Sequence, residues 1–144
     1  VNEKPSFRAA FKTRHAVIPM SGYYEWQTTP EGKQPYYFQP EKHAATLWVA
    51  GLWEPRHALQ TDASSGSFTI ITQEADGLPA TIHNRMPVFM EAHDVQEWLS
   101  LKPGPSLPFL LTRSLPALKV HAVSKRVNNG REDDAGLIES VALA

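Results

Sequence analysis

The chain has 144 residues, of which 14 are Lys or Arg, 15 are Asp or Glu, and none is Cys. This length suits one domain with its own core, and the ordinary composition excludes wholesale disorder. The net charge of −1 is unlike that of a bulk nucleic-acid binder, whose domain is usually strongly basic. Because the chain has no Cys, it contains no disulfide, zinc ribbon, iron–sulfur cluster or thiol nucleophile of its own.

Hydropathy gives no sign of a membrane segment. The longest apolar run, Thr46–Trp53, is far shorter than the roughly 20 residues that span a bilayer, and no signal sequence opens the chain. Basic residues gather near both ends of the chain: Lys4, Arg8, Lys12 and Arg14, then Lys125, Arg126 and Arg131. These two groups are either a local track for phosphates or part of an ordinary mixed surface.

The first third of the chain predicts one helix followed by strands. Phe7, Ala10 and Phe11 have helical spacing. The segments expected next are a strand at Ala16–Pro19, a strand at Gly22–Gln27, a turn at Thr28–Gln34, and a strand at Pro35–Gln39 that forms a hairpin with Gly22–Gln27.

The remainder of the chain predicts further strands and two more helices. Strands are expected at Thr46–Trp53 (central), Ser67–Thr72, Leu118–Ser124 and Gly136–Val141; helices at about Glu91–Ser100 and Leu107–Thr112; and a loop at Asp62–Ser67. Strands that are interrupted by about three helices, without regular βαβ alternation, indicate the α+β class.

The segment Ser21–Trp26, SGYYEW, is the first candidate for chemistry. In a strand, Tyr23 and Glu25 point to one face, while Tyr24 and Trp26 point to the other. A single Glu in so aromatic a run is a candidate for partial burial, which would favour its protonated form and suit it to proton transfer. The alternative is a Glu on the solvent face of an amphipathic strand.

The segment Thr81–Pro87, TIHNRMP, is the second candidate. His83 can move a proton and Arg85 can bind an anion, and both lie on one Pro-bounded loop. The alternative is that Arg85 pairs with a carboxylate and His83 packs beneath it. No GxSxG, P-loop, GxGxxG or HExxH motif occurs, and the six His show no ligand spacing, so neither a metal nor a cofactor is expected.

Taken together, these segments resemble the SRAP family, the SOS-response-associated peptidase fold that includes bacterial and human abasic-site shielding proteins. The matching runs occur in family order over residues 2–141: EKPSFRAAF, IPMSGYYEW, GKQPYYF, AGLWE, FTIITQEA, IHNRMPV, EWL and HAVSKRVNN. GYYEW and IHNRMP are the most specific runs. The family often has Asp after the histidine, where this chain has Asn84.

The resemblance implies covalent capture of abasic sites in single-stranded DNA. In the family, the α-amine of an N-terminal Cys forms a Schiff base with the aldehyde of the opened sugar, and the thiol then closes a thiazolidine ring. Glu25 matches the family's glutamate, which assists ring opening and proton transfer. His83 matches the histidine beside the sugar and its phosphate. The expected DNA contacts are Arg85, Asn84 and Trp26.

The resemblance also implies N-terminal self-processing, which gives the peptidase name, a weak β-elimination (lyase) activity, and a cytoplasmic bacterial protein that joins the nucleoid when it acts. The implied fold is a single domain, residues 1–144, with a strongly curved mixed or antiparallel sheet, a pseudo-barrel. The family's Cys and an Asn-x-Arg DNA-contact motif fall before Val1. We therefore expect the chain to be the C-terminal two-thirds of the domain, with the N-terminal segment as a missing partner, and unable to crosslink DNA alone.

Two other functions stay open at this point. One is a non-catalytic module for single-stranded DNA, in which aromatic residues such as Tyr23, Trp26 and Trp53 stack on bases. The other is a peptidase that acts on other proteins, for which the chain shows no nucleophile–base pair.

Overall fold

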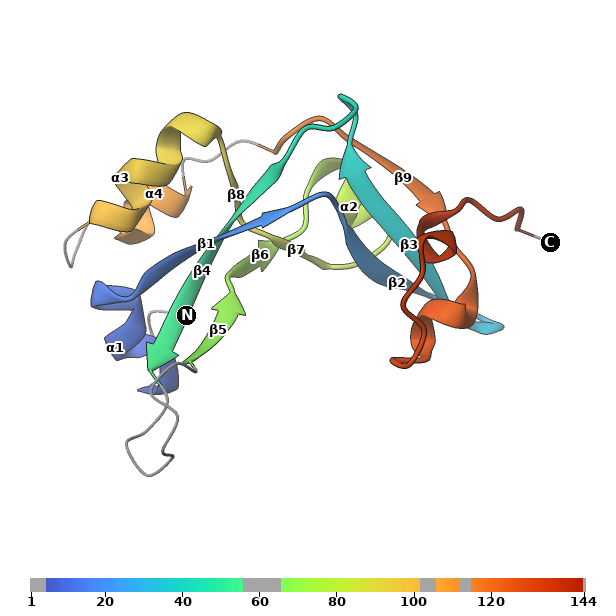
Figure 1. The fold of residues 1–144 in the computed structure, drawn as a ribbon, viewed down its shortest axis with the longest axis horizontal. Coiled ribbons are helices and arrows are strands. Elements are labelled where there is room, and N and C mark those ends of the chain that lie inside the picture. Colours follow the sequence, from blue (N-terminus) through green and yellow to red (C-terminus); the bar gives the residue numbers. More distant parts are fainter. Residues whose placement is uncertain (1–4, 56–65, 102–105, 112–114, 144) are drawn as a thin grey trace. The chain divides into compact units, whose positions relative to one another are not determined.

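The computed structural model describes residues 5–55, 66–101, 106–111 and 115–143 (Figure 1). The contacts within the chain divide it into two compact units. Unit 1 comprises Val1–Pro19, Trp48–Gln73 and Pro87–Pro116, and unit 2 comprises Met20–Leu47, Glu74–Met86 and Ala117–Ala144. Because the chain passes several times between them, each unit is assembled from segments that are distant in the sequence.

Unit 1 holds the larger apolar core. Its elements are α1 (Pro5–Thr13), β1 (His15–Met20), β4 (Leu47–Pro55), β5 (Gly66–Ile70), β8 (Phe89–Met90), the 3-10 turn η1 (Ala92–Asp94), α3 (Val95–Ser100) and α4 (Ser106–Leu111). The sheet has the order β1-β4-β5, and β8 also pairs with β4. Trp98 is fully buried in this core, where its indole N–H donates to the Ala16 carbonyl at 2.8 Å.

Unit 2 is built on a three-stranded antiparallel sheet with the order β2-β3-β9. Its elements are β2 (Tyr23–Thr29), β3 (Gly32–Pro40), α2 (Gly77–Ala80), β9 (Leu118–Ala122) and the 3-10 turns η2 (Lys125–Asn128) and η3 (Ala135–Ile138). The β2–β3 hairpin turns between Thr29 and Gly32, and Gly32 has φ 110°, a conformation that favours glycine. A separate pair consists of β6 (Thr72–Glu74) and β7 (Arg85–Pro87).

The expected α+β class is confirmed, and the pairs β2–β3, β3–β9, β4–β5 and β4–β8 are all antiparallel. The strands are distributed over three sheets. The expected hairpin is present, and its strands extend into the segment that was expected to be a turn. The expected central strand at Thr46–Trp53 is β4, which pairs on both sides. No helix among the described residues is long and apolar enough to cross a membrane.

One expected element is wrong, one is present with a different first turn, and one lies mostly outside the described residues. The strand at Gly136–Val141 is wrong: Asp134 caps Gly136 N–H and starts the turn η3, after which only Ser140 forms a bridge, to Val123. The helix near Glu91–Ser100 starts as a 3-10 turn, since the side chains of Glu91 and Asp94 cap each other's backbone. The loop at Asp62–Ser67 lies outside the described residues up to residue 65, and Ser67 belongs to β5.

Candidate functional site

The candidate site forms around β2, the edge strand of the unit 2 sheet. Glu25 lies opposite Tyr36 of β3, and Trp26 lies opposite Pro35, so the two neighbouring side chains start on opposite faces of the hairpin. Both nevertheless line one pocket, because an edge strand leaves one side of the backbone uncovered and a ligand can reach around it. The expected alternation is therefore present, and it creates a site with two faces.

His83 is carried by a loop that short local hydrogen bonds hold in place. Asp76 caps the N-terminus of α2 by accepting Gly77 N–H at 2.7 Å. After α2, the backbone N–H of His83 donates to the Pro79 carbonyl at 3.1 Å, and the Asn84 carbonyl accepts from Ala75 N–H at 3.0 Å. The backbone on both sides of the His83 ring is therefore fixed by hydrogen bonds within the loop.

Gln27 connects this loop to β2. Its side-chain amide donates to the Thr81 carbonyl at 2.9 Å, two residues before His83. Its amide oxygen accepts from the Tyr36 hydroxyl at 3.2 Å, which fixes the orientation of the amide. Because Gln27 and Glu25 lie two residues apart on one strand, they share a face, and the tether brings the His83 loop to the face that carries Glu25.

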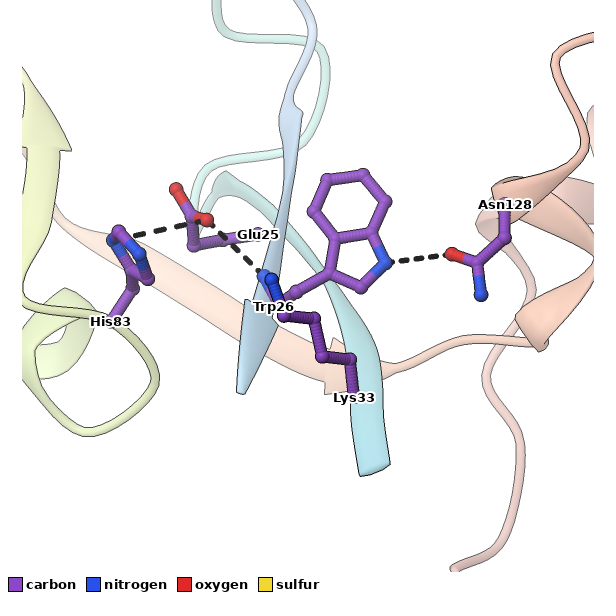
Figure 2. Close-up of a pocket in the computed structure, with 5 residues that line it drawn as sticks. All are labelled: Glu25, Trp26, Lys33, His83 and Asn128. Atoms are coloured by element: carbon purple, nitrogen blue, oxygen red, sulfur yellow. Dashed lines mark hydrogen bonds and ion pairs between the residues drawn. The ribbon is translucent and has the colours of Figure 1, made fainter. Parts of the chain in front are cut away.

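Glu25 and His83 approach each other closely. The Oε1 atom of Glu25 lies 3.8 Å from Nδ1 of His83, and the two side chains are 25% and 39% exposed. The same carboxylate oxygen accepts the backbone N–H of Trp26 at 3.2 Å. Figure 2 shows the carboxylate and the imidazole turned toward each other across the edge of β2. An acid/base pair that is half-buried and open to a ligand is suited to moving a proton.

The Nδ1 atom of His83 lies close to the backbone of Arg85 and to Glu25. When the ring is neutral, Nδ1 accepts the backbone N–H of Arg85 at 3.1 Å, which places the ring proton on Nε2. When Nδ1 carries a proton, both the Arg85 carbonyl, at 3.3 Å, and Glu25 are available as acceptors. The backbone N–H of Arg85 favours the tautomer in which Nδ1 accepts, and Glu25 lies 3.8 Å from the same atom.

On the other face of β2, the indole of Trp26 is held in one orientation. Its N–H donates to Oδ1 of Asn128 at 2.7 Å, and Asn128 lies at the end of η2. The pocket of about 360 Å³ is lined by Glu25, Trp26, Lys33, His83 and Asn128 (Figure 2). It therefore combines a carboxylate and an imidazole with an aromatic plane, an amide and one ammonium group.

Tyr23 lies two residues before Glu25 on β2 and therefore on the same face of the strand. Burial, and then the negative charge of Glu25, raise the pKa of the Tyr23 hydroxyl well above its usual range. Its ring stacks on Phe38 with centroids 4.9 Å apart. The hydroxyl therefore stays protonated, and the ring packs in the sheet rather than offering a free face to a base.

The structure brings together three of the five residues singled out in the sequence: Glu25, His83 and Trp26 all line the pocket. Asn84 and Arg85 are exposed and follow His83 in the loop, but they do not line the pocket. Both serve the loop through their backbones, because the Asn84 carbonyl closes the turn and the Arg85 N–H orients the imidazole.

In each of the two expected basic groups, one arginine is paired with carboxylates. In unit 1, Arg14 is bound to Glu54. In unit 2, one nitrogen of Arg126 lies 2.5 Å from carboxylate oxygens of both Glu132 and Asp134. Residue 4 lies outside the described residues. The charges of Arg14 and Arg126 are therefore each taken up by a carboxylate within their own unit.

Sequence reasoning missed two lining residues, Lys33 and Asn128. Lys33 was placed in a turn, although extending the predicted hairpin by two pairs puts it opposite Thr28, beside Trp26. Asn128 lies in the run HAVSKRVNN, which drew attention only as part of a family pattern. Within the described part of the chain, no group of three His, Asp or Glu side chains is arranged to hold a metal ion.

Comparison with known proteins identifies relatives over nearly the whole chain. The family model described as "SOS response associated peptidase (SRAP)" matches residues 1–130. The chain is 30% identical over 165 aligned residues to the abasic site processing protein HMCES of Xenopus tropicalis, covering 99% of this chain and 48% of that protein. It is 31% identical to the abasic site processing protein YoqW of Bacillus subtilis (strain 168), covering 97% of this chain and 63% of that protein.

Solved structures show the same fold. A protein from Bacteroides thetaiotaomicron has a TM-score of 0.77 at 21% identity, with 99% of this chain and 63% of that one covered. A protein from Bordetella bronchiseptica has a TM-score of 0.71 at 26% identity, with 85% and 61% covered. The chain thus spans about half to two-thirds of the length of these relatives.

Proposed function

Because the chain belongs to the SOS response associated peptidase (SRAP) family, we propose that it acts on abasic sites in single-stranded DNA. The observation that carries this proposal is the approach of Glu25 and His83 at the edge of β2, 3.8 Å apart and open to a ligand. The names of the relatives, abasic site processing proteins, supply the substrate class.

The roles of the two residues follow from the chemistry of an abasic sugar. Its closed ring exposes an aldehyde only after a proton leaves the C1 hydroxyl and another reaches the ring oxygen. Attack by an amine on that aldehyde then needs a proton to turn the departing hydroxyl into water. We assign the giving and accepting of these protons to Glu25 and His83, whose side chains lie 3.8 Å apart.

Covalent capture through a thiazolidine needs an amine and a thiol on one residue. The 144 residues contain no Cys, so this step requires a residue outside them. We therefore assign the proton-transfer half of the reaction to this chain. N-terminal self-processing, weak β-elimination and action in the bacterial cytoplasm belong to the same proposal, as does the absence of a cofactor.

The test compares two single-stranded oligonucleotides that differ at one position, an abasic site against a normal nucleotide. We expect the 144-residue chain to bind the abasic strand more tightly, measured by fluorescence anisotropy, and to leave no covalent band on a denaturing gel. Equal affinity for both strands would instead favour a module that binds single strands without recognising damage. A covalent band would contradict the assignment of capture to a cysteine outside this chain.

A further inference from the structure

The pocket has one cation whose charge is not cancelled by a carboxylate. Among the described residues no ion pair involves Lys33, whereas Arg126 is held by both Glu132 and Asp134. Lys33 is exposed and lines the pocket. Its ammonium is therefore available to a negatively charged ligand, and the nearby guanidinium is not.

The register of the hairpin fixes which face Lys33 occupies. Lys33 lies opposite Thr28, and Trp26 lies opposite Pro35, so Lys33 and Trp26 are diagonal neighbours on one face. Figure 2 shows the Lys33 side chain extending from β3 toward Trp26. Diagonal neighbours of this kind come within reach of long side chains, so the ammonium and the indole can contact one ligand together.

The two faces of the pocket consequently differ in charge. Glu25 places a negative charge on one face, with His83 beside it, and Lys33 places a positive charge on the other. A phosphate is repelled from the first face and attracted to the second, and the Debye length at physiological salt, over which such charges act, is about 8 Å. This polarity orients any ligand that carries both a reacting sugar and a phosphate.

We propose that Lys33 is the phosphate-binding residue of this pocket, and that it binds a phosphodiester next to the abasic sugar while the sugar faces Glu25 and His83. The proposal rests on the proposed function. It goes further by assigning the charge contact to β3 rather than to the arginine of the IHNRMP segment, Arg85, which does not line the pocket. It also implies that the strand lies in the pocket in one direction, which the test below identifies.

The test measures the salt dependence of binding to single-stranded DNA that carries a tetrahydrofuran, a stable abasic analogue without an aldehyde. Each phosphate contact on a single strand contributes a slope of about −0.7 in log K against log salt. Between 50 and 200 mM salt, the affinity of the unmodified chain should therefore fall about 2.6-fold further than that of Lys33→Ala. Lys33→Arg, which keeps the charge, should restore the slope.

Lys119→Ala is the matched control, because Lys119 is exposed on β9 of the same sheet and does not line the pocket. It should leave the slope unchanged. Replacing one flanking phosphodiester by a neutral methylphosphonate should abolish the effect of Lys33→Ala when the replacement is on one side of the lesion only. The affected side then identifies the strand direction.

Several results would overturn the proposal. An unchanged slope in Lys33→Ala, or an equal loss in Lys119→Ala, would make Lys33 an ordinary surface lysine, while a preserved preference for the abasic strand would leave the proposed function standing. Methylphosphonates that are without effect on either side would also refute it. If the unmodified chain does not distinguish abasic from undamaged strands, the proposed function fails, and the assignment of Lys33 fails with it.

Discussion

Each of the two compact units contains a tryptophan whose indole N–H donates a hydrogen bond, but the two rings differ in burial and in the kind of acceptor. In unit 1, Trp98 is 0% exposed, and its N–H donates to a backbone carbonyl, that of Ala16. In unit 2, Trp26 is half-buried, and its N–H donates to a side chain, that of Asn128. The buried ring of Trp98, hydrogen-bonded to the backbone, stabilises the core. The half-buried ring of Trp26, hydrogen-bonded to a side chain, has a fixed orientation at the pocket.

The neighbours of the two rings support this distinction. Trp98 stacks on His15 and Phe109, with ring centroids 4.0 Å and 6.0 Å apart, so both of its faces are occupied by the protein. Trp26 instead lines the pocket that also contains Lys33. The two rings therefore differ in their surroundings: Trp98 is enclosed by the core, and Trp26 is oriented by Asn128 at the pocket.

The largest effect is expected from exchanging the two rings for alanine. Trp98→Ala should lower the free energy of unfolding by about 3–5 kcal/mol, as large core truncations do. Trp26→Ala should lower it by less than about 2 kcal/mol and weaken DNA binding about tenfold or more, because stacking on one base is worth about 1–3 kcal/mol. Urea unfolding and fluorescence anisotropy measure the two quantities; equal losses of stability would remove the distinction.

A smaller effect is expected at Gln27, which connects the His83 loop to β2. Gln27→Ala should cost about 0.5–1.5 kcal/mol of stability, the usual value of one hydrogen bond, and slow covalent capture about tenfold through misplacement of His83. Rates are measured in a form of the protein that carries the N-terminal cysteine. Gln34→Ala is the control, since Gln34, the cross-strand partner of Gln27, donates to the Pro35 and Val123 carbonyls, makes no contact with the His83 loop within the described residues that is comparable to that of Gln27, and does not line the pocket. Equal rates for the two variants would contradict a positioning role for Gln27.

The smallest effect concerns the carboxylates that hold Arg126. The hydrogen bond from the Arg126 side chain holds the pKa of Asp134 below its ordinary value of 3.8. A lowered pKa in the folded state stabilises the protein above the unfolded value, and this contribution disappears as the pH falls through the folded one. Titration of the Asp134 carboxyl by NMR should give a pKa below 3.8, and Arg126→Gln should raise that pKa. An unchanged pKa of Asp134 in Arg126→Gln would show that Arg126 does not lower this pKa.

Several features of the fold and the site could be predicted from the sequence, because they depend on residues that are close together in the chain. Alternation placed Glu25 and Trp26 on opposite faces of a strand, and the apolar run Thr46–Trp53 identified the central strand of unit 1. The His, Asn and Arg on one Pro-bounded loop singled out His83, which has no periodic signal of its own. These predictions depend only on residues that are neighbours in the chain.

The parts that sequence reasoning missed depend on contacts between distant segments. The bond between Trp26 and Asn128 joins residues 102 positions apart, and that between Gln27 and Thr81 joins residues 54 apart. Neither is encoded in a periodic pattern. The ion pairs of Arg126 were missed for another reason. Counting charges along the sequence gives a basic cluster at Lys125, Arg126 and Arg131, but the turn that starts η3 places Asp134 beside the Arg126 guanidinium.

The most direct test of the central claim is the rate of covalent capture by Glu25→Gln, in a form of the protein that carries the N-terminal cysteine. The amide keeps the shape of the carboxylate but cannot take up a proton. We expect capture of abasic single-stranded DNA, followed on denaturing gels, to slow about 10²–10⁴-fold, the usual contribution of a general acid/base, with affinity for the tetrahydrofuran strand little changed. An unchanged rate would contradict the account and make Glu25 a structural residue of β2.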